Sequence, residues 1–217
     1  KVVSLVGARP QFVKEACLGA AVRETQAWTH VLAHSGQHYD LAMSDIFFQE
    51  LDIPQPVYNL GIGSGSHAAM TAAALTGMED VLSKEKPDAL LVYGDTNTTL
   101  AGALAAAKMA VPVIHVEAGI RMQPRTMPEE INRVLTDRIS ALMCCCSEVG
   151  RRNLAAEGIT QGVEVCGDLM YDVYRRMEKR LQPDAACSRF GLRSGSFAVA
   201  TIHRDYNTDN PDALRGI

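Results

Sequence analysis

Short apolar runs alternate along this chain with longer segments of helical pattern, and this alternation is the feature that most limits its fold. The predicted strands are 2–7, 29–34, 88–94, 111–117, 141–146 and 162–166. Their nearly continuous apolar residues are typical of strands buried on both faces of a parallel sheet. We therefore predict an α/β fold, a Rossmann-like doubly wound parallel sheet with helices on both faces.

The predicted helices are 10–25, 40–51, 67–85, 97–109, 128–139, 147–157 and 168–181. Several of their ends carry the chemistry of helix boundaries. Pro10 lies where the first helix starts, and Asp95 or Thr96 can cap the helix that follows. The run 126–129, Thr-Met-Pro-Glu, is typical of a capping box. Gly158 is a C-cap candidate.

A change of composition predicts a domain boundary near residues 168–192. The chain becomes highly charged after Tyr171, and a new buried strand is expected at 196–202, with Pro211 opening a helix beyond it. The predicted organisation is an N-terminal Rossmann-like domain over 1–168, a hinge helix and linker over 169–192, and the start of a second, incomplete Rossmann-like domain over 193–217.

Bulk composition excludes some function classes. The net charge of −4 argues against a nucleic-acid partner, although one local arginine can still serve a small phosphorylated ligand. No apolar run reaches membrane-spanning length, because Lys108 and Pro112 interrupt the longest candidate at 100–116. The apolar N-terminus is too short for a signal sequence, so we expect a cytoplasmic protein with no membrane partner.

Cysteine and histidine spacing gives no metal motif. The cysteines form no CxxC pair, and we expect them to be small buried hydrophobic residues of a reduced compartment; they are Cys17, Cys144, Cys145, Cys146, Cys166 and Cys187. His34, His38 and Asp40 are metal-ligand types, but their spacing falls in a turn. We therefore expect no metal site.

Charged and polar residues gather where the predicted strands end, and the carboxyl ends of parallel strands are where such sheets bind ligands. Arg9 follows the first strand at a helix N-terminus, where backbone amides attract anions, and Lys14 comes one turn later. Asp95 lies in a polar run of glycine and threonines. His115 and Glu117 are two apart in a strand, so we expect both side chains to point the same way.

Each of these residues also has a structural interpretation. Arg9 can be surface charge, Asp95 can be only a helix cap, and Glu117 can be satisfied by backbone amides. The capping box by itself accounts for Glu129. A helical pair of Glu130 and Arg133 needs no function. His203, after the strand expected at 196–202, is either a proton carrier or phosphate ligand, or a solvated loop histidine.

Taken together, the motifs resemble the N-terminal part of the non-hydrolysing UDP-N-acetylglucosamine 2-epimerases. They occur in family order over essentially the whole chain: Gly7-Ala8-Arg9-Pro10, Gly36-Gln37-His38, Gly94-Asp95-Thr96, His115-Val116-Glu117-Ala118-Gly119, Pro128-Glu129-Glu130-Ile131-Asn132-Arg133, Gly167-Asp168 and Thr201-Ile202-His203-Arg204. The combination is highly specific, although each motif alone is not.

The resemblance implies a GT-B fold of two Rossmann-like halves, with the site between them. It implies inversion at C2 of a UDP-sugar without NAD, metal or other cofactor, by elimination of UDP and re-addition, in a cytoplasmic homodimer that serves polysaccharide biosynthesis. By motif, Asp95, Glu117 and Glu129 are the acid/base residues and His203 assists the leaving diphosphate. The implied substrate-binding residues are Arg9, Lys14, His38, Thr96, His115 and Arg133.

Departures from the common family pattern leave the exact reaction open. Ala8 and Gln11 stand where many members have Thr and Glu. The branch that includes UDP-2,3-diacetamido-glucuronate 2-epimerases is resembled by two segments, Gln11-Phe12-Val13-Lys14 and His34-Ser35-Gly36-Gln37-His38-Tyr39-Asp40. Asp40 replaces a glutamine common in substrate-activated members, so regulation by substrate is not expected. A hydrolysing epimerase, a GT-B glycosyltransferase and a non-catalytic nucleotide-sugar-binding module are the alternatives.

Overall fold

The structure is a computed structural model that describes residues 1–36, 48–202 and 205–217. The chain separates into two compact units, Lys1–Arg176 and Met177–Ile217. Most of the helix expected at 40–51 lies outside the described residues. In the part of it that the structure describes, residues 48–50 are helical. Within the described residues, no helix is long and apolar enough to cross a bilayer.

The first unit is built on a parallel sheet of seven strands in the order β3-β2-β1-β4-β5-β6-β7. The strands are β1 (Val2–Val6), β2 (His30–His34), β3 (Tyr58–Asn59), β4 (Ala89–Tyr93), β5 (Val113–Ala118), β6 (Leu142–Cys145) and β7 (Val163–Val165). The predicted strands are confirmed to within about two residues, and β3 is a short addition at the edge. The chain order reverses between β1 and β4, and this switch point is where Rossmann-like sheets open a ligand crevice.

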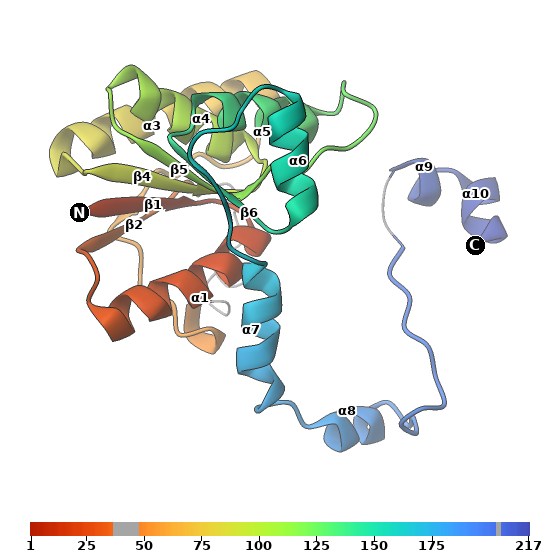
Figure 1. Ribbon diagram of the computed structural model, residues 1–217. Helices are drawn as coiled ribbons and strands as arrows, with labels where there is room; N and C mark the ends of the chain where they lie inside the picture. The colour runs from red at the N-terminus through yellow and green to blue at the C-terminus, as the bar shows by residue number, and fades with distance from the viewer. Residues whose placement is uncertain (37–47, 203–204) are drawn as a thin grey trace. The chain divides into compact units, whose positions relative to one another are not determined.

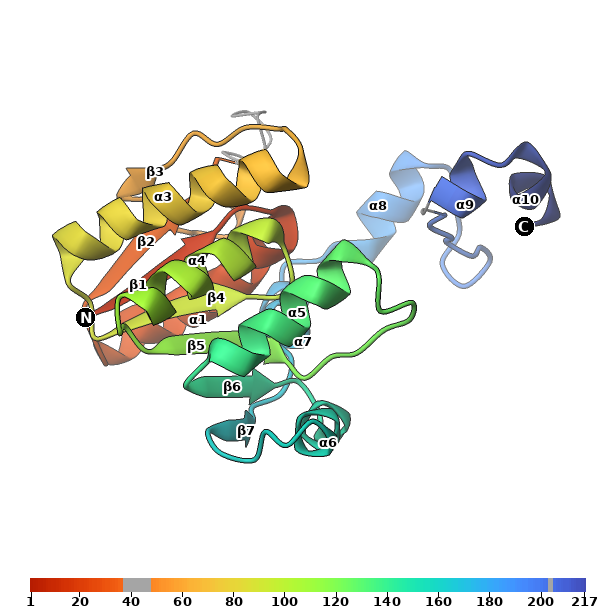
Figure 2. The same cartoon turned by 90° about the horizontal axis from the view of Figure 1, so that it is seen from above.

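Helices cover both faces of the sheet (Figure 1). One face carries α1 (Arg9–Thr25) and α7 (Leu169–Glu178). The other face carries α3 (His67–Glu85), α4 (Asn97–Lys108) and α5 (Pro128–Ile139), which lie side by side in Figure 2. The short α6 (Glu148–Ala156) packs against β6 and β7. The predicted doubly wound α/β class is therefore confirmed.

Apolar clusters lie on both faces of the sheet as a result of this layering. Under α3 and α4, the core includes Leu5, Met78 and Leu90, none of them more than 1% exposed. Under α1, Phe12 and Tyr93 are equally buried. Burying apolar surface stabilises by about 25 cal/mol per Å², so these two layers fix the position of the strand ends that carry the polar residues.

The helices that lie wholly within the described residues agree with their predicted boundaries to within about three residues, α5 included, but the capping predicted for α5 does not hold. Pro10 lies in the first turn of α1, Thr96 is the N-cap of α4, and Gly158 adopts a left-handed φ of 78° just after α6. The capping box predicted at 126–129 is wrong: the N-cap is Met127, whose side chain makes no capping bond. The helix begins one residue later than the box requires, and the carboxylate of the third helical residue, Glu130, is used elsewhere.

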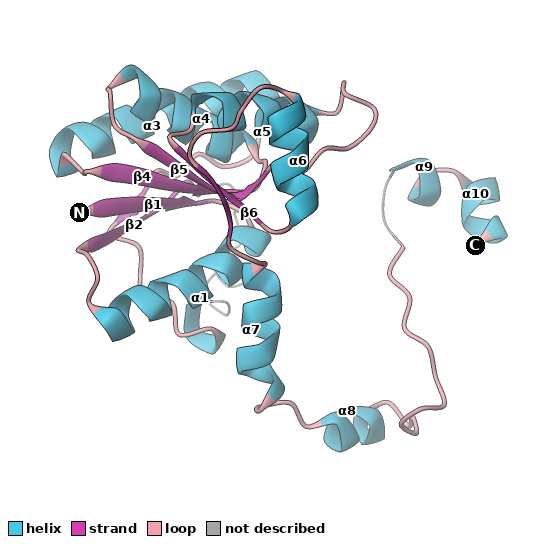
Figure 3. Ribbon diagram, viewed as in Figure 1, coloured by secondary structure: helices cyan, strands magenta, loops and turns pink. Residues whose placement is uncertain are grey.

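The second unit contains α8 (Pro183–Arg189), α9 (Asp205–Thr208) and α10 (Pro211–Gly216), which begins at the predicted proline. The strand predicted at 196–202 is wrong, since these residues are coil (Figure 3) and Val199 is 80% exposed. A strand needs a neighbour to satisfy its backbone groups. Among the residues described in this unit, no second strand exists to pair with it.

Candidate active site

A hollow of about 220 Å³ opens at the switch point, where the chain leaves β1, β4 and β5. Its lining is Ala8, Pro10, Gln11, Lys14, Tyr93, Gly94, Asp95, Thr96 and Glu117. A second hollow of about 210 Å³ shares Asp95 and Thr96 and adds Glu129 from the start of α5. The structure thus brings three predicted carboxylates, Asp95, Glu117 and Glu129, to two adjoining hollows.

Glu117 forms an ion pair with Lys14, which is only 5% exposed. Glu117 has a left-handed φ of 73° and lies where the β5–β6 register shifts between Val116 and Ala118. This bulge breaks the alternation of side chains, so the expectation that His115 and Glu117 point the same way is wrong. Glu117 pairs with α1 and His115 with α5, on opposite faces of the sheet (Figure 1).

Asp95 is held by Arg133 of α5, which forms ion pairs with Asp95 and, at 3.1 Å, with Glu130. The predicted helical pair of Glu130 and Arg133 is therefore confirmed. Glu130 is only 2% exposed and also accepts a hydrogen bond from the backbone N–H of Met122 at 3.0 Å. Arg133 therefore acts on the hollow through its ion pair with Asp95, and the buried carboxylate of Glu130 fixes the guanidinium group of Arg133.

Gln11 joins the β1 and β4 loops, a role that the sequence did not indicate. Its Oε1 accepts hydrogen bonds from the backbone N–H groups of Gly7 at 2.7 Å and Ala8 at 3.0 Å. Its Nε2 donates to the Tyr93 carbonyl at 2.7 Å and to Thr99 Oγ1 at 2.9 Å. A side-chain amide has both the donors and the acceptor that this position needs, whereas an ionised carboxylate has only acceptors.

His115 is completely buried, and both ring nitrogens have partners. Nε2 lies 2.7 Å from the Gly94 carbonyl oxygen, and Nδ1 lies 2.7 Å from Asp137 Oδ1. Asp137 also forms an ion pair with Arg121 at 2.8 Å. Neither Asp137 nor Arg121 was predicted from the sequence. The one available signal is that Asp137 lies one helical turn beyond Arg133, on the same face of α5.

The other predicted residues are spread around this site. Arg9 is exposed at the first position of α1, and Thr96 is half-buried as the cap of α4. His38 and His203 lie outside the described residues. Within the described part of the chain, no group of three or more His, Cys, Asp or Glu residues is placed to hold a metal ion.

The cysteines are less uniformly buried than predicted. All six are free thiols, but only Cys17 and Cys145 are buried and Cys166 is exposed. Burial raises the pKa of Cys144 to about 12. The expectation of six buried hydrophobic residues is therefore wrong for Cys166, which directly follows the edge strand β7.

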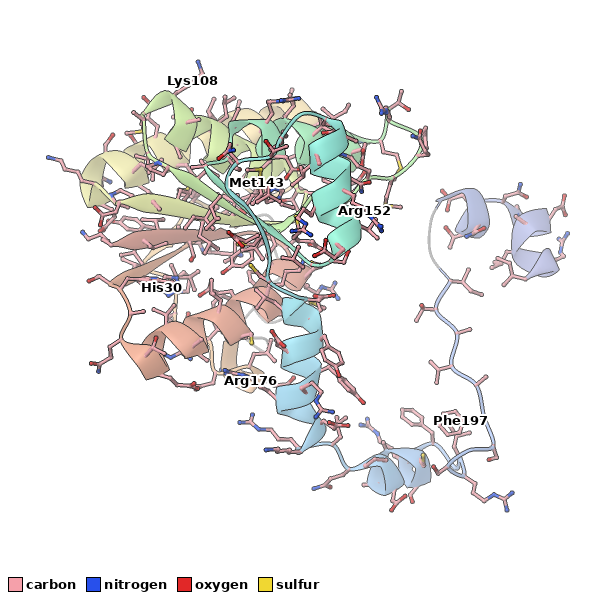
Figure 4. The ribbon with its side chains drawn as sticks, viewed as in Figure 1. His30, Lys108, Met143, Arg152, Arg176 and Phe197 are labelled. Carbon is pink, nitrogen blue, oxygen red and sulfur yellow. The ribbon has the colours of Figure 1, made fainter. Side chains whose placement is uncertain are left out.

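A buried polar cluster lies on the α1 face of the sheet, beside the hollow. Tyr93 donates its hydroxyl hydrogen to Glu15 Oε2 at 2.6 Å, and Ser4 Oγ lies 2.7 Å from Nε2 of His30. His30, labelled in Figure 4, is also 3.5 Å from Glu15. Burial raises the pKa of Glu15 to about 7, against the lowering effect of its hydrogen bonds.

The fold and the polar switch-point hollow define a Rossmann-like α/β protein with a candidate ligand site at the carboxyl ends of its parallel strands. Residues 20–217 match the family model described as UDP-N-acetylglucosamine 2-epimerase. The chain belongs to the UDP-N-acetylglucosamine 2-epimerase family, whose named members are isomerases.

Individual relatives agree with this assignment. A UDP-N-acetylglucosamine 2-epimerase homolog of Methanococcus maripaludis is 46% identical over 219 residues, covering 100% of this chain and 61% of that protein. The UDP-2,3-diacetamido-2,3-dideoxy-D-glucuronate 2-epimerase of Pseudomonas aeruginosa is also 46% identical, over 221 residues, with the same coverage of 100% and 61%.

A solved structure gives the same result. The crystal structure of the Methanocaldococcus jannaschii UDP-GlcNAc 2-epimerase in complex with UDP-GlcNAc and UDP superposes with a TM-score of 0.86 at 40% identity, over 99% of this chain and 59% of that one. The chain therefore spans less than two thirds of the length of these relatives.

Proposed function

We propose that the full-length protein carrying this chain is a non-hydrolysing 2-epimerase that interconverts UDP-GlcNAc and UDP-ManNAc. The observation that carries the proposal is the placement of Asp95, Glu117 and Glu129 around adjoining hollows at the sheet's switch point. Carboxylates beside a diphosphate weaken binding unless they take part in chemistry. Family membership and a relative solved with UDP-GlcNAc support the substrate class.

The proposed reaction follows from the chemistry of the sugar. The C2 proton has no adjacent carbonyl, so its direct removal is too costly, and anti elimination of UDP to a 2-acetamidoglucal followed by re-addition avoids that cost. The carboxylates serve as general acid and base. Lys14 and Arg133 form ion pairs with Glu117 and Asp95. Arg9 at the α1 N-terminus and His203 would stabilise the departing diphosphate.

An NMR time course of the full-length protein with UDP-GlcNAc in deuterated water tests this proposal. We expect deuterium at C2 together with signals of the ManNAc-type product. Addition of UDP and the glycal should regenerate the UDP-sugar. Release of free sugar would instead indicate a hydrolysing epimerase, and C2 without deuterium would contradict the elimination mechanism for this substrate.

A UDP-2,3-diacetamido-glucuronate is the second candidate substrate. The P. aeruginosa relative named for that sugar supports this candidate. Gln11 also supports it, because the oxygen and the nitrogen of its side-chain amide are both hydrogen-bonded. The same NMR experiment with this uronate separates the two. Exchange with the uronate alone would assign the chain to that branch, whereas silence with both substrates would favour a glycosyltransferase or a binding module.

We also propose that the protein is a homodimer that pairs through the outer surface of α3 and α5. The supporting feature is an apolar hollow of about 560 Å³ lined by residues that include Ala68, Leu75 and Ile131. Ile131 is 47% exposed and Leu135, one turn further on, is 46% exposed. Light scattering should give a dimer for the wild type and a monomer for Ile131→Asp; a monomeric wild type would refute the pairing.

A further inference from the structure

The hydrogen bonds of His115 determine how many protons its ring carries. The Gly94 carbonyl oxygen can only accept, so Nε2, at 2.7 Å, must carry a hydrogen. Nδ1 faces Asp137 Oδ1 at the same distance. The charge of the ring therefore depends on whether Asp137 is ionised.

The surroundings of Asp137 favour the carboxylate. Its Oδ2 accepts from the backbone N–H of Gly119 at 3.2 Å and from Arg121 Nη1 at 2.8 Å. An ionised carboxylate can only accept, so Nδ1 carries a hydrogen as well.

Charge balance leads to the same result. Arg121 is shared between Asp137 and Glu157, whose two oxygens it contacts at 2.7 Å each. One guanidinium thus faces two carboxylates. A buried carboxylate without a cation is strongly unfavourable, and a protonated His115 supplies the second positive charge.

We infer that His115 is a doubly protonated imidazolium and that His115 and Asp137 are positioning residues that fix the Gly94–Asp95 turn. Gly94 has a left-handed φ of 63°, and its N–H bonds to the Val116 carbonyl at 3.0 Å. The imidazolium holds the carbonyl of the same residue, so the peptide that leads into Asp95 is anchored. Because Asp95 lines both hollows, this anchor sets the direction of a central carboxylate.

This inference deepens the proposed function and rests on it for its catalytic part, although the protonation state does not. It also changes the role of His115, which was predicted to bind the substrate. A ring with no exposed surface and two occupied nitrogens acts on the substrate through Gly94 and Asp95, and not by direct contact.

Nitrogen NMR of the protein labelled with ¹⁵N-histidine tests the protonation state. Both ring nitrogens of His115 should resonate as protonated, each with a one-bond coupling to hydrogen. His115→Gln assigns the signal by its loss. A wild-type spectrum with one unprotonated nitrogen would overturn the inference, whether or not the protein is an epimerase.

Kinetics of Asp137→Asn in the full-length protein test the positioning role. The amide keeps an acceptor for Nδ1 but removes the charge, so we expect loss of the second proton and a fall in kcat of roughly 100-fold, as for a small misplacement of a catalytic group. KM should stay within about twofold. Asp88→Asn, an exposed aspartate before β4, is the matched control and should leave both constants unchanged.

The positioning role and the protonation state of His115 can be refuted separately. A raised KM with unchanged kcat would show that His115 contacts the substrate, and an unchanged kcat and KM would remove the positioning role. If Asp137→Asn does not fold, judged by circular dichroism, the wild-type NMR spectrum still decides the protonation state. If the wild type shows no C2 exchange, the proposed function has failed while the imidazolium can stand.

Discussion

Lys14 of α1 and Glu117 of β5 form an ion pair at the edge of the hollow, although they are 103 positions apart in the sequence. The lysine is almost entirely buried, while the carboxylate keeps a partly exposed side chain. The geometry thus combines a protected cation with an accessible acid.

Lys14→Met should therefore lower kcat/KM of the full-length protein by roughly 100- to 1,000-fold, since it removes the positive charge beside Glu117 while keeping a long apolar side chain. Steady-state kinetics with the UDP-sugar measure the effect. Lys108→Met is the matched control, because Lys108 is exposed at the end of α4 (Figure 4). Equal activity in the two variants would remove Lys14 from the site.

Arg133→Met should destabilise the protein, because it leaves the buried Glu130 without its cation. Removing one partner of a buried ion pair costs roughly 3–5 kcal/mol of unfolding free energy. The partial exposure of Asp95 lowers the cost at Asp95 but not at the buried Glu130. Urea denaturation followed by circular dichroism measures the loss. The double variant Arg133→Met with Glu130→Gln should recover part of it. Additive losses would show that the two residues are not coupled.

The sheet and the edge that carries the candidate site were predictable from the sequence because they depend on local patterns. Continuous apolar runs located the strands, and parallel topology then required Asp95 and Glu117 to lie at the same edge. The direction of Glu117 was not predictable. A register shift at the end of β5 turns that residue away from the face of His115, and no local pattern indicates a bulge of this kind.

Hydrogen-bond partners from distant segments could not be predicted from the sequence for the same reason. Asp137 meets His115 only because α5 crosses β5, and Gln11 bridges two loops only because β1 and β4 are neighbours. The strand expected at 196–202 failed for a related reason. An apolar run becomes a strand only when another strand is present to pair with it.

Glu15 should make stability depend on pH. Its pKa is raised from 4.5 to about 7, so between these values the folded state keeps a proton that the unfolded state has lost. The free energy of unfolding should therefore fall as pH rises through this window, by roughly 3 kcal/mol in total, and level off above it. Glu15→Gln, which cannot ionise, should lack this slope.

Denaturation of both proteins in urea at several pH values from about 4.5 to 8 measures the difference. His30 contributes a slope of the opposite sign, since burial lowers its pKa, and it is present in both proteins. Parallel pH curves for wild type and Glu15→Gln would show that the carboxyl group of Glu15 titrates normally in the fold.

Gly119 and Gly158 form a matched pair that separates backbone strain from steric overlap. Both have left-handed φ values, 76° and 78°. A Cβ on Gly119 would lie 2.4 Å from the Gly150 carbonyl oxygen, whereas a Cβ on Gly158 would meet nothing within 4 Å. Gly158→Ala should cost about 1–2 kcal/mol from conformation alone. Gly119→Ala adds an overlap with backbone and should cost roughly 2–5 kcal/mol.

Urea denaturation gives both free energies, and the difference between them isolates the close approach of α6 to the end of β5. Gly119 also accepts a hydrogen bond on its carbonyl from Asn153 at 2.9 Å, and its N–H donates to Asp137 at 3.2 Å. Displacing Gly119 should therefore also disturb the partner of His115. Equal losses for the two alanine variants would mean that α6 can move away without cost, and that the turn after β5 is less fixed than its contacts indicate.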